Sequence, residues 1–150
     1  MYSRQESSET RKKFWTSFGQ YMRPVTGANG DRINWVNYKT GRKHIYFRMD
    51  VDNKKASIAI ELQHSDPAQR VECFEQFVQL KNILEDITTE KWNWEKEHKD
   101  EHGQVIGRIV KTLDGVNIFN QEDWPSIISF LKPRMIALDE FWQMAKDGFE

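Results

Sequence analysis

The strongest constraint on the fold is residues 44–64, HIYFRMDVDNKKASIAIELQH, in which apolar and polar side chains alternate. A period of two predicts β-strands that bury one face. The segment DNKK predicts a turn in the middle, because Asp and Asn favour turn conformations. With that turn, Val51 lies opposite Ala56 and Ile45 lies opposite Leu62, so the apolar side chains share one face. The stretch therefore predicts a hairpin with one buried face and one polar face.

The remaining patterns predict an α+β domain. INWVNY, residues 33–38, predicts a strand before the hairpin, which would make a three-stranded antiparallel meander. Residues 92–113 predict a second hairpin around Gly103. Apolar side chains at three- and four-residue steps predict an N-terminal helix from about Arg11 to Pro24, one long helix after Asp66, and a C-terminal helix that Pro133 kinks or divides. We expect a single domain, 1–150, with its antiparallel sheet packed against these helices.

The composition limits the functions that the chain can have. A net charge of −1 does not favour binding to nucleic acid. Nucleic acid stays a possible partner only if a local patch of positive charge binds it. The single cysteine, Cys73, excludes an intrachain disulfide and is expected to be buried. We find no signal-like or membrane-spanning run, and expect a cytoplasmic protein without a membrane partner. His98 and His102 have metal-ligand spacing but no third ligand, and no motif indicates a cofactor or a metal.

Four polar residues of the first hairpin form the one pattern that suggests catalysis. Asp50, Asp52, Glu61 and Gln63 are similar to the carboxylate set of PD-(D/E)xK nucleases, which holds a divalent metal ion. In the predicted register Glu61 lies opposite Tyr46. At ~3.3 Å per residue, Asp50 is then roughly 13 Å and Asp52 roughly 20 Å from Glu61, too far to share an ion. A divergent metal-dependent nuclease stays as an alternative only.

The polar face of the hairpin predicts an interaction surface instead. Tyr46, Arg48 and Glu61 lie on this face, and Trp35 would lie near Tyr46 if INWVNY pairs with the next strand. Arg108, within the strand-like segment GRIV, completes the predicted surface, whose Trp, Tyr and Arg are typical of interfaces. Two alternatives stay open: another element of the chain covers this face, or a small ligand binds near Trp35, Tyr46 and Arg108. We expect a non-enzymatic interaction domain that binds an unknown protein partner or forms a homodimer.

Over nearly its whole length, the chain resembles a known family. The similar segments are FWTSFGQYM, INWVNYKTGRKHIYFRMD, NKKASIAIEL, GRIV and NIFNQEDWPSIISFLKPRMIALDEFW, and the family is domain of unknown function 4268 in its short, stand-alone form. Its Val-Glu-Leu-like triplet, Trp-rich strand and Arg-Ile pair correspond to residues 60–62, 92–94 and 108–109. The family has no established activity. Related domains lie at the C-terminal end of longer bacterial proteins, some of which have nuclease-like N-terminal parts. The resemblance therefore implies a bacterial accessory domain in DNA metabolism or defence.

Overall fold

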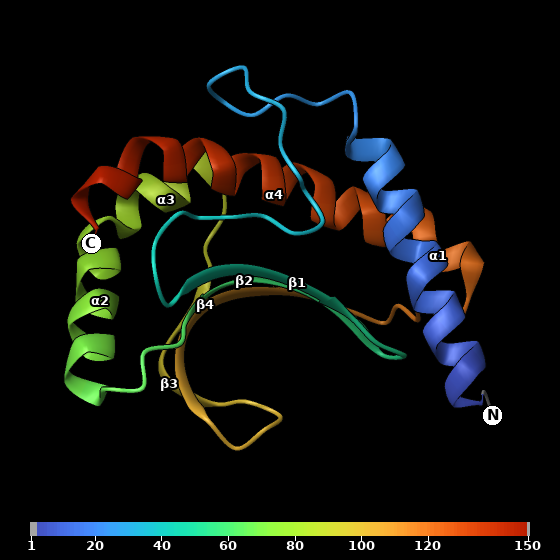
Figure 1. Ribbon diagram of the computed structural model, residues 1–150, viewed down its shortest axis with the longest axis horizontal. Coiled ribbons are helices and arrows are strands. Elements are labelled where there is room, and N and C mark those ends of the chain that lie inside the picture. The colour runs from blue at the N-terminus through green and yellow to red at the C-terminus, as the bar shows by residue number, and fades with distance from the viewer. Residues whose placement is uncertain (1–2, 150) are drawn as a thin grey trace.

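The computed structural model describes residues 3–149, which form an antiparallel sheet with helices over one of its faces (Figure 1). In chain order the elements are α1 (Arg4–Met22), β1 (Ile45–Val51), β2 (Lys55–Leu62), α2 (Pro67–Gln79), α3 (Lys81–Thr88), β3 (Asn93–Lys99), β4 (Val105–Asp114) and α4 (Trp124–Ala145), with short 3-10 turns at Gln121–Asp123 and Lys146–Gly148. The α+β fold class is thus confirmed. Among residues 3–149, no helix combines the length and apolar character that crossing a membrane requires.

The four-stranded sheet has the order β1-β2-β4-β3, and every neighbouring pair is antiparallel. The predicted register of the first hairpin is confirmed: Ile45 pairs with Leu62 and Val51 with Ala56. The predicted second hairpin is also confirmed, with β3 and β4 joined by a turn at Gly103, whose φ of 79° is accessible to glycine at little cost. Because β2 pairs with β1 and β4, β1 is one edge of the sheet and β3 is the other.

The predicted strand at residues 33–38 is wrong, and so is the meander that it would complete. This segment is a loop in which the Asn37 N–H donates to the Asn34 side-chain oxygen at 3.1 Å, a local turn that competes with strand pairing. Trp35 donates from its indole Nε1 to the Val25 carbonyl at 3.0 Å. Trp35 and Tyr38, three residues apart, are both buried, so the segment does not keep the period of two that a strand requires.

Two helical segments differ from their predicted bounds, and of the kink or division predicted at Pro133 the division does not occur. α1 begins at Arg4, because Ser3 at the N-cap and Glu6 in the first turn form a capping box. The predicted cap at Asp66 is confirmed, since its side chain accepts the Ala68 N–H at 3.1 Å, but the long helix is broken at Leu80 (φ −100°, ψ 8°) into α2 and α3. α4 continues through Pro133 as one helix and is not divided.

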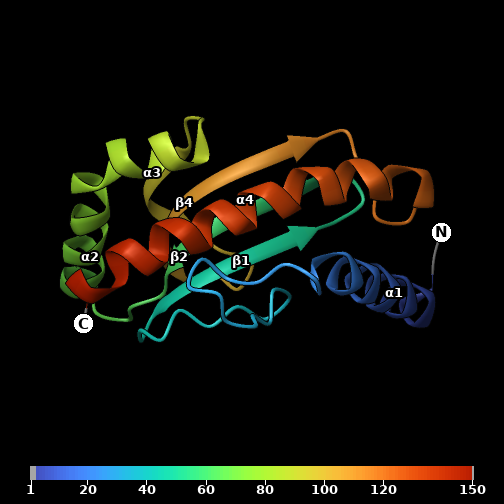
Figure 2. The same cartoon turned by 90° about the horizontal axis from the view of Figure 1, so that it is seen from above.

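The core lies between one sheet face and the helices. α4 runs along the length of the sheet, with α1 and α2 towards opposite ends (Figure 2). The rings of Phe47 on β1 and Phe77 on α2 both contact Trp142 on α4, with centroids 5.7 and 6.2 Å away. All three side chains are almost fully buried. Aromatic contacts between sheet and helix therefore connect the two layers.

A buried carboxylate on α4 holds the loop that precedes β1. Asp139 is 1% exposed and accepts hydrogen bonds from the Tyr38 hydroxyl and, at 2.8 Å, from the Ala28 N–H. Gln143 donates to the same carboxylate at 3.0 Å. Burial, together with the Asp139 hydrogen bond and charge, raises the pKa of Tyr38 well above its ordinary value, so its hydroxyl stays a donor. The Asp139 contacts thus fix this loop against α4, and its last part, residues 36–40, lies beside β1 (Figures 1 and 2).

Candidate functional site

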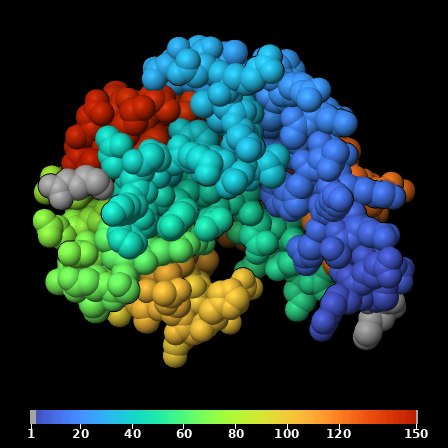
Figure 3. All heavy atoms as spheres, viewed as in Figure 1, coloured from blue at the N-terminus to red at the C-terminus, as the bar shows by residue number. Residues whose placement is uncertain are grey.

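Within residues 3–149, one face of the sheet is not covered by a helix. The sheet curves away from α4, and no helix is drawn across its concave side (Figure 1). In the space-filling view, the β3–β4 hairpin and α1 stand on either side of an indentation below the sheet (Figure 3). Ala59, Ile106 and Val110 are buried but lie outside the main core cluster, as their register positions on this second face require. We call this surface the outer face.

A row of four side chains crosses the outer face. Tyr46 pairs with Glu61, Glu61 with Arg108, and Arg108 with Glu95, one residue from each strand. The Arg108 guanidinium binds the Glu95 carboxylate through two hydrogen bonds, of 2.8 and 3.3 Å. Glu61 accepts a hydrogen bond of 2.9 Å from Gln63. Glu61 and Arg108, both predicted as surface residues, do lie on this face, where contacts within the chain hold their side chains in place.

Tyr46 and Arg48 form the more accessible end of this face. The Tyr46 side chain is 38% exposed, and the Arg48 guanidinium carbon lies 4.7 Å from the centre of its ring. This cation–π contact orders both side chains while leaving the hydrogen-bond donors of Arg48 available. Four of the five predicted surface residues therefore lie together, and these two are the ones that face solvent.

Trp35, the fifth predicted surface residue, was predicted wrongly. It is 3% exposed and its ring lies 6.2 Å from that of Tyr38, which stacks on Phe47 at 5.1 Å. Phe47 belongs to the face that packs against the helices, whereas Tyr46 belongs to the outer face. The sheet separates Trp35 from Tyr46, so the pocket predicted near Trp35, Tyr46 and Arg108 does not form.

The four residues of the nuclease alternative are not brought together. The confirmed register pairs Glu61 with Tyr46, and Asp50 lies four residues further along β1, roughly 13 Å away at ~3.3 Å per residue. Asp52 caps the turn instead, accepting the N–H groups of Lys54 and Lys55 at 2.8 and 2.9 Å. Gln63 binds Glu61 itself. Within residues 3–149, no three His, Cys, Asp or Glu side chains are grouped so that they could hold one metal ion.

The free edge of β1 was not predicted. The His44 carbonyl accepts the Gln63 N–H at 2.8 Å, and the Asp52 N–H donates to the Lys55 carbonyl at 2.9 Å. Since backbone hydrogen bonds alternate along an antiparallel strand, the even-numbered residues of β1 bond to β2 and the odd-numbered ones point away from it. Phe47 is one of these odd-numbered residues.

The chain itself closes the two ends of this edge but not its middle. The Ile45 carbonyl accepts the Thr40 hydroxyl at 2.7 Å, and the Val51 carbonyl accepts a guanidinium N–H of Arg11 at 2.6 Å. Between them, the outward N–H and C=O groups of Phe47 and Met49 have no hydrogen-bond partner among residues 3–149.

A groove of about 440 Å³ runs beside this edge, between β1 and the preceding loop. We call it the edge groove; it is lined by residues 36–43 and 45–49. Its charged lining residues are all cations: Lys39, Arg42, Lys43 and Arg48. Arg42 donates to the Phe149 carbonyl at 2.8 Å and lies 3.7 Å from Asp147, while Lys39 and Lys43 are exposed and have no ion pair in the described part of the chain.

A second cleft, of about 600 Å³, lies at the end of the sheet between residues 41–45 and α2. Cys73 lines it and is buried, as predicted, and desolvation raises the pKa of its thiol to about 11. His64 stacks near His44, with ring centroids 4.8 Å apart; burial, and then the neighbouring His44 and Arg70, lower the pKa of His64. A protonated thiol is a poor nucleophile, so this cleft does not present activated thiol chemistry.

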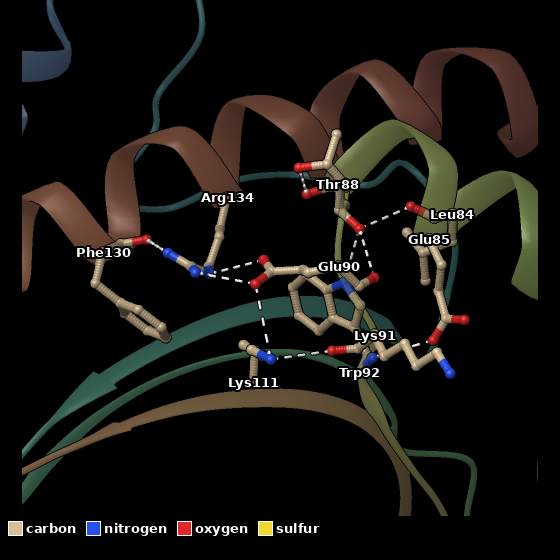
Figure 4. A network of polar contacts seen from close by, with 10 residues as sticks. Leu84, Glu85, Thr88, Glu90, Lys91, Trp92, Lys111, Phe130 and Arg134 are labelled. Atoms are coloured by element: carbon tan, nitrogen blue, oxygen red, sulfur yellow. Dashed lines mark hydrogen bonds and ion pairs between the residues drawn. The ribbon is translucent and has the colours of Figure 1, made fainter.

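Polar contacts also join the sheet to the helices on its covered face (Figure 4). Glu90 pairs with Arg134 of α4 at 3.0 Å and lies 3.7 Å from the Lys111 ammonium of β4. Desolvation opposes ionisation of Glu85, but hydrogen bonds from the Trp92 N–H and the Trp94 indole outweigh it and lower the Glu85 pKa. These groups bind one another, which makes the network a structural support between layers.

The model of a family described as Domain of unknown function (DUF4268) matches residues 10–146. No curated protein matches the chain, and no solved structure matches it.

Proposed function

Because this chain belongs to the DUF4268 family, whose description assigns no activity, we propose its function from its surface: it is a non-enzymatic interaction domain that binds another protein at the β1 side of the sheet. The observation that carries the proposal is that β1 combines an exposed Tyr–Arg pair with an open backbone edge. Tyr and Arg are among the residue types that are enriched in binding hot spots.

The arrangement of the outer face supports this function. Tyr46 and Arg48 are ordered by their own contact, so binding would immobilise fewer free rotamers. Behind them, the bonds of Arg108 to Glu95 and of Gln63 to Glu61 keep the neighbouring polar groups satisfied. A rigid polar background with a few accessible anchors is typical of interfaces in which a handful of residues dominates the affinity.

We propose the setting that the family resemblance implies: an accessory role in bacterial DNA metabolism or defence, in the cytoplasm. The separate positions of Asp50 and Glu61 favour a binding role over metal-dependent cleavage by this chain. In this setting the domain would bring a partner protein to a complex rather than perform the reaction.

The proposal is tested by selecting ligands from a display library of random peptides on the immobilised protein. The enriched peptides are then compared on the wild type and on the double variant Tyr46→Glu/Arg48→Glu. We expect them to bind the wild type and to lose at least about tenfold in affinity on the variant, because two anchor residues are removed.

The matched control is Tyr21→Glu/Arg23→Glu, which makes the same two changes on exposed residues of α1 and the segment after it. This control should bind the peptides like the wild type. An absence of enrichment, or peptides that bind both double variants equally well, would contradict the proposed interaction surface.

A further inference from the structure

We propose that the ligand of this interaction domain is an extended acidic segment of a partner protein, which adds to the free edge of β1 as a fifth strand within the edge groove. This inference rests on the proposed interaction function and specifies its ligand. It follows from three independent properties of the groove: its backbone groups, its shape and its charge.

The backbone of β1 requires a strand-like ligand. The outward N–H and C=O groups of Phe47 and Met49 lack hydrogen-bond partners in the described chain. In contrast, the Ile45 carbonyl accepts a hydrogen bond from Thr40, and the Val51 carbonyl accepts one from Arg11. An added peptide strand lies about 4.8 Å away and satisfies such groups in pairs, which is the general mode of β-strand addition. The two closed carbonyls limit the added pairing to the middle of β1.

The loop leaves room for that strand and cannot easily close the gap. Its Tyr38 ring stacks on Phe47 at 5.1 Å and its hydroxyl is bound to Asp139, so the loop wall is held from two sides. The resulting groove of about 440 Å³ has the size of an ordinary ligand site. A groove that exists before binding spares the ligand the cost of opening it.

The charges select an acidic strand. Within residues 3–149, Lys39 and Lys43 present ammonium groups without an ion pair on the loop side, Arg48 presents its guanidinium on the strand side, and none of the lining residues is anionic. Carboxylates of an incoming strand would meet complementary charge from both sides. A second copy of this chain, pairing edge to edge, would instead bring these cations together, and like charges across an interface are unfavourable.

The first experiment uses fluorescein-labelled synthetic peptides and fluorescence anisotropy. The probe alternates Glu and Val, and its twin alternates Lys and Val. Two further acidic peptides carry N-methyl groups, either on all Val amides or on all Glu amides, so each blocks one edge of the peptide strand. We expect the acidic peptide to bind and the basic twin not to bind. Only one of the two methylated peptides should lose binding, because only one edge faces β1.

The second experiment changes the protein. Lys39→Glu/Lys43→Glu should weaken binding of the acidic probe by about tenfold at low salt, with a smaller effect at high salt. Lys12→Glu/Lys13→Glu, the same change at exposed positions of α1, is the matched control and should leave binding unchanged. Hydrogen exchange at Phe47 and Met49 should slow on binding, while Tyr46 and Arg48, whose amides point to β2, should not change.

Three results would overturn the inference: equal binding of the basic twin, tolerance of both methylated peptides, or protection away from β1. A dimer in light scattering that Lys39→Glu/Lys43→Glu strengthens would indicate a second copy at this edge, and displacement of the probe by single-stranded oligothymidylate would indicate nucleic acid. If display-selected peptides bind through Tyr46 and Arg48 but the acidic probe does not bind, this inference fails and the proposed function stands.

Discussion

Removal of the Asp139 carboxylate should loosen the wall of the edge groove and destabilise the whole domain. Asp139→Ala leaves the buried Tyr38 hydroxyl without its acceptor, which costs about 1–3 kcal/mol, and removes the acceptor of the partly exposed Ala28 N–H, which adds about 0.5–1.5 kcal/mol. Relief from burying a carboxylate offsets part of this loss. We expect the free energy of unfolding to fall by about 2–4 kcal/mol, measured by urea denaturation.

Asp139→Asn provides the matched comparison. Its amide oxygen can accept the Ala28 N–H while its NH2 group donates to the Tyr38 hydroxyl, which can rotate to accept, and only the hydrogen bond from Gln143 to the replaced oxygen is lost. The cost should therefore be smaller, about 0.5–1.5 kcal/mol. Amides in residues 25–40 should exchange faster in Asp139→Ala than in Asp139→Asn. A loss below about 0.5 kcal/mol in Asp139→Ala, or a larger loss in Asp139→Asn, would refute the idea that this carboxylate holds the loop.

The same site predicts how stability depends on pH. The folded-state pKa of Tyr38 is raised above its ordinary value of 10.0, mainly by burial and then by Asp139. Its contribution to stability is thus complete below about pH 10 and is lost as pH rises further, because the unfolded state ionises first. Three further predictions concern other sites. Gly27→Ala should destabilise the protein by about 1–2 kcal/mol in urea denaturation, because the added Cβ would lie 2.7 Å from the Ile33 side chain, whereas Gly148→Ala has open space and should have no effect. Cys73 should react slowly with Ellman's reagent at pH 8 in the native protein and rapidly in urea, since its pKa is raised to about 11; rapid native reaction would contradict its burial. Titration with Mg²⁺ or Mn²⁺ should leave the melting temperature unchanged, and a shift that Glu61→Ala abolishes would revive the nuclease alternative.

Local sequence patterns predicted the fold correctly where the alternation of apolar and polar residues matches the buried and exposed faces of a strand. The register of the first hairpin follows from its sequence because a slip by one residue would move the core-facing apolar side chains of β1 or β2 to the outer face. A run of residues that favour strands misled at residues 33–38, where Asn34 forms a turn and Asp139, about a hundred positions along the chain, binds the loop. No proline or glycine lies at the break at Leu80, so the sequence does not predict it. The break accompanies a change of packing, since α2 contacts the sheet and α3 contacts α4.

The candidate site was predictable in part for the same reason. Tyr46, Arg48, Glu61 and Arg108 share a face because strand residues alternate, and that much is local. Whether β1 is an edge depends on which strand lies beside it. The wrong strand at residues 33–38 would have paired with β1 on the side to which the N–H and C=O groups of Phe47 point, so the prediction covered the edge that the structure leaves open.

The two edges of the sheet differ in a way that favours β1 as the docking strand. β3 has an irregularity between Glu95 and His98, and such bulges twist an edge away from regular pairing. β1 keeps an unbroken register with β2 along its whole length, so its outward groups are regularly spaced, as a second strand requires. Exposed regular edges promote self-association unless something opposes it. Here the charges that would oppose self-association are those of Lys39 and Lys43, which lie on the loop beside β1 rather than on β1 itself. They would repel a second copy but leave the outward backbone groups of β1 accessible. In the proposed binding mode, a regular, open and cationic edge is complementary to an acidic strand, whereas pairing with a second copy would bring like charges together.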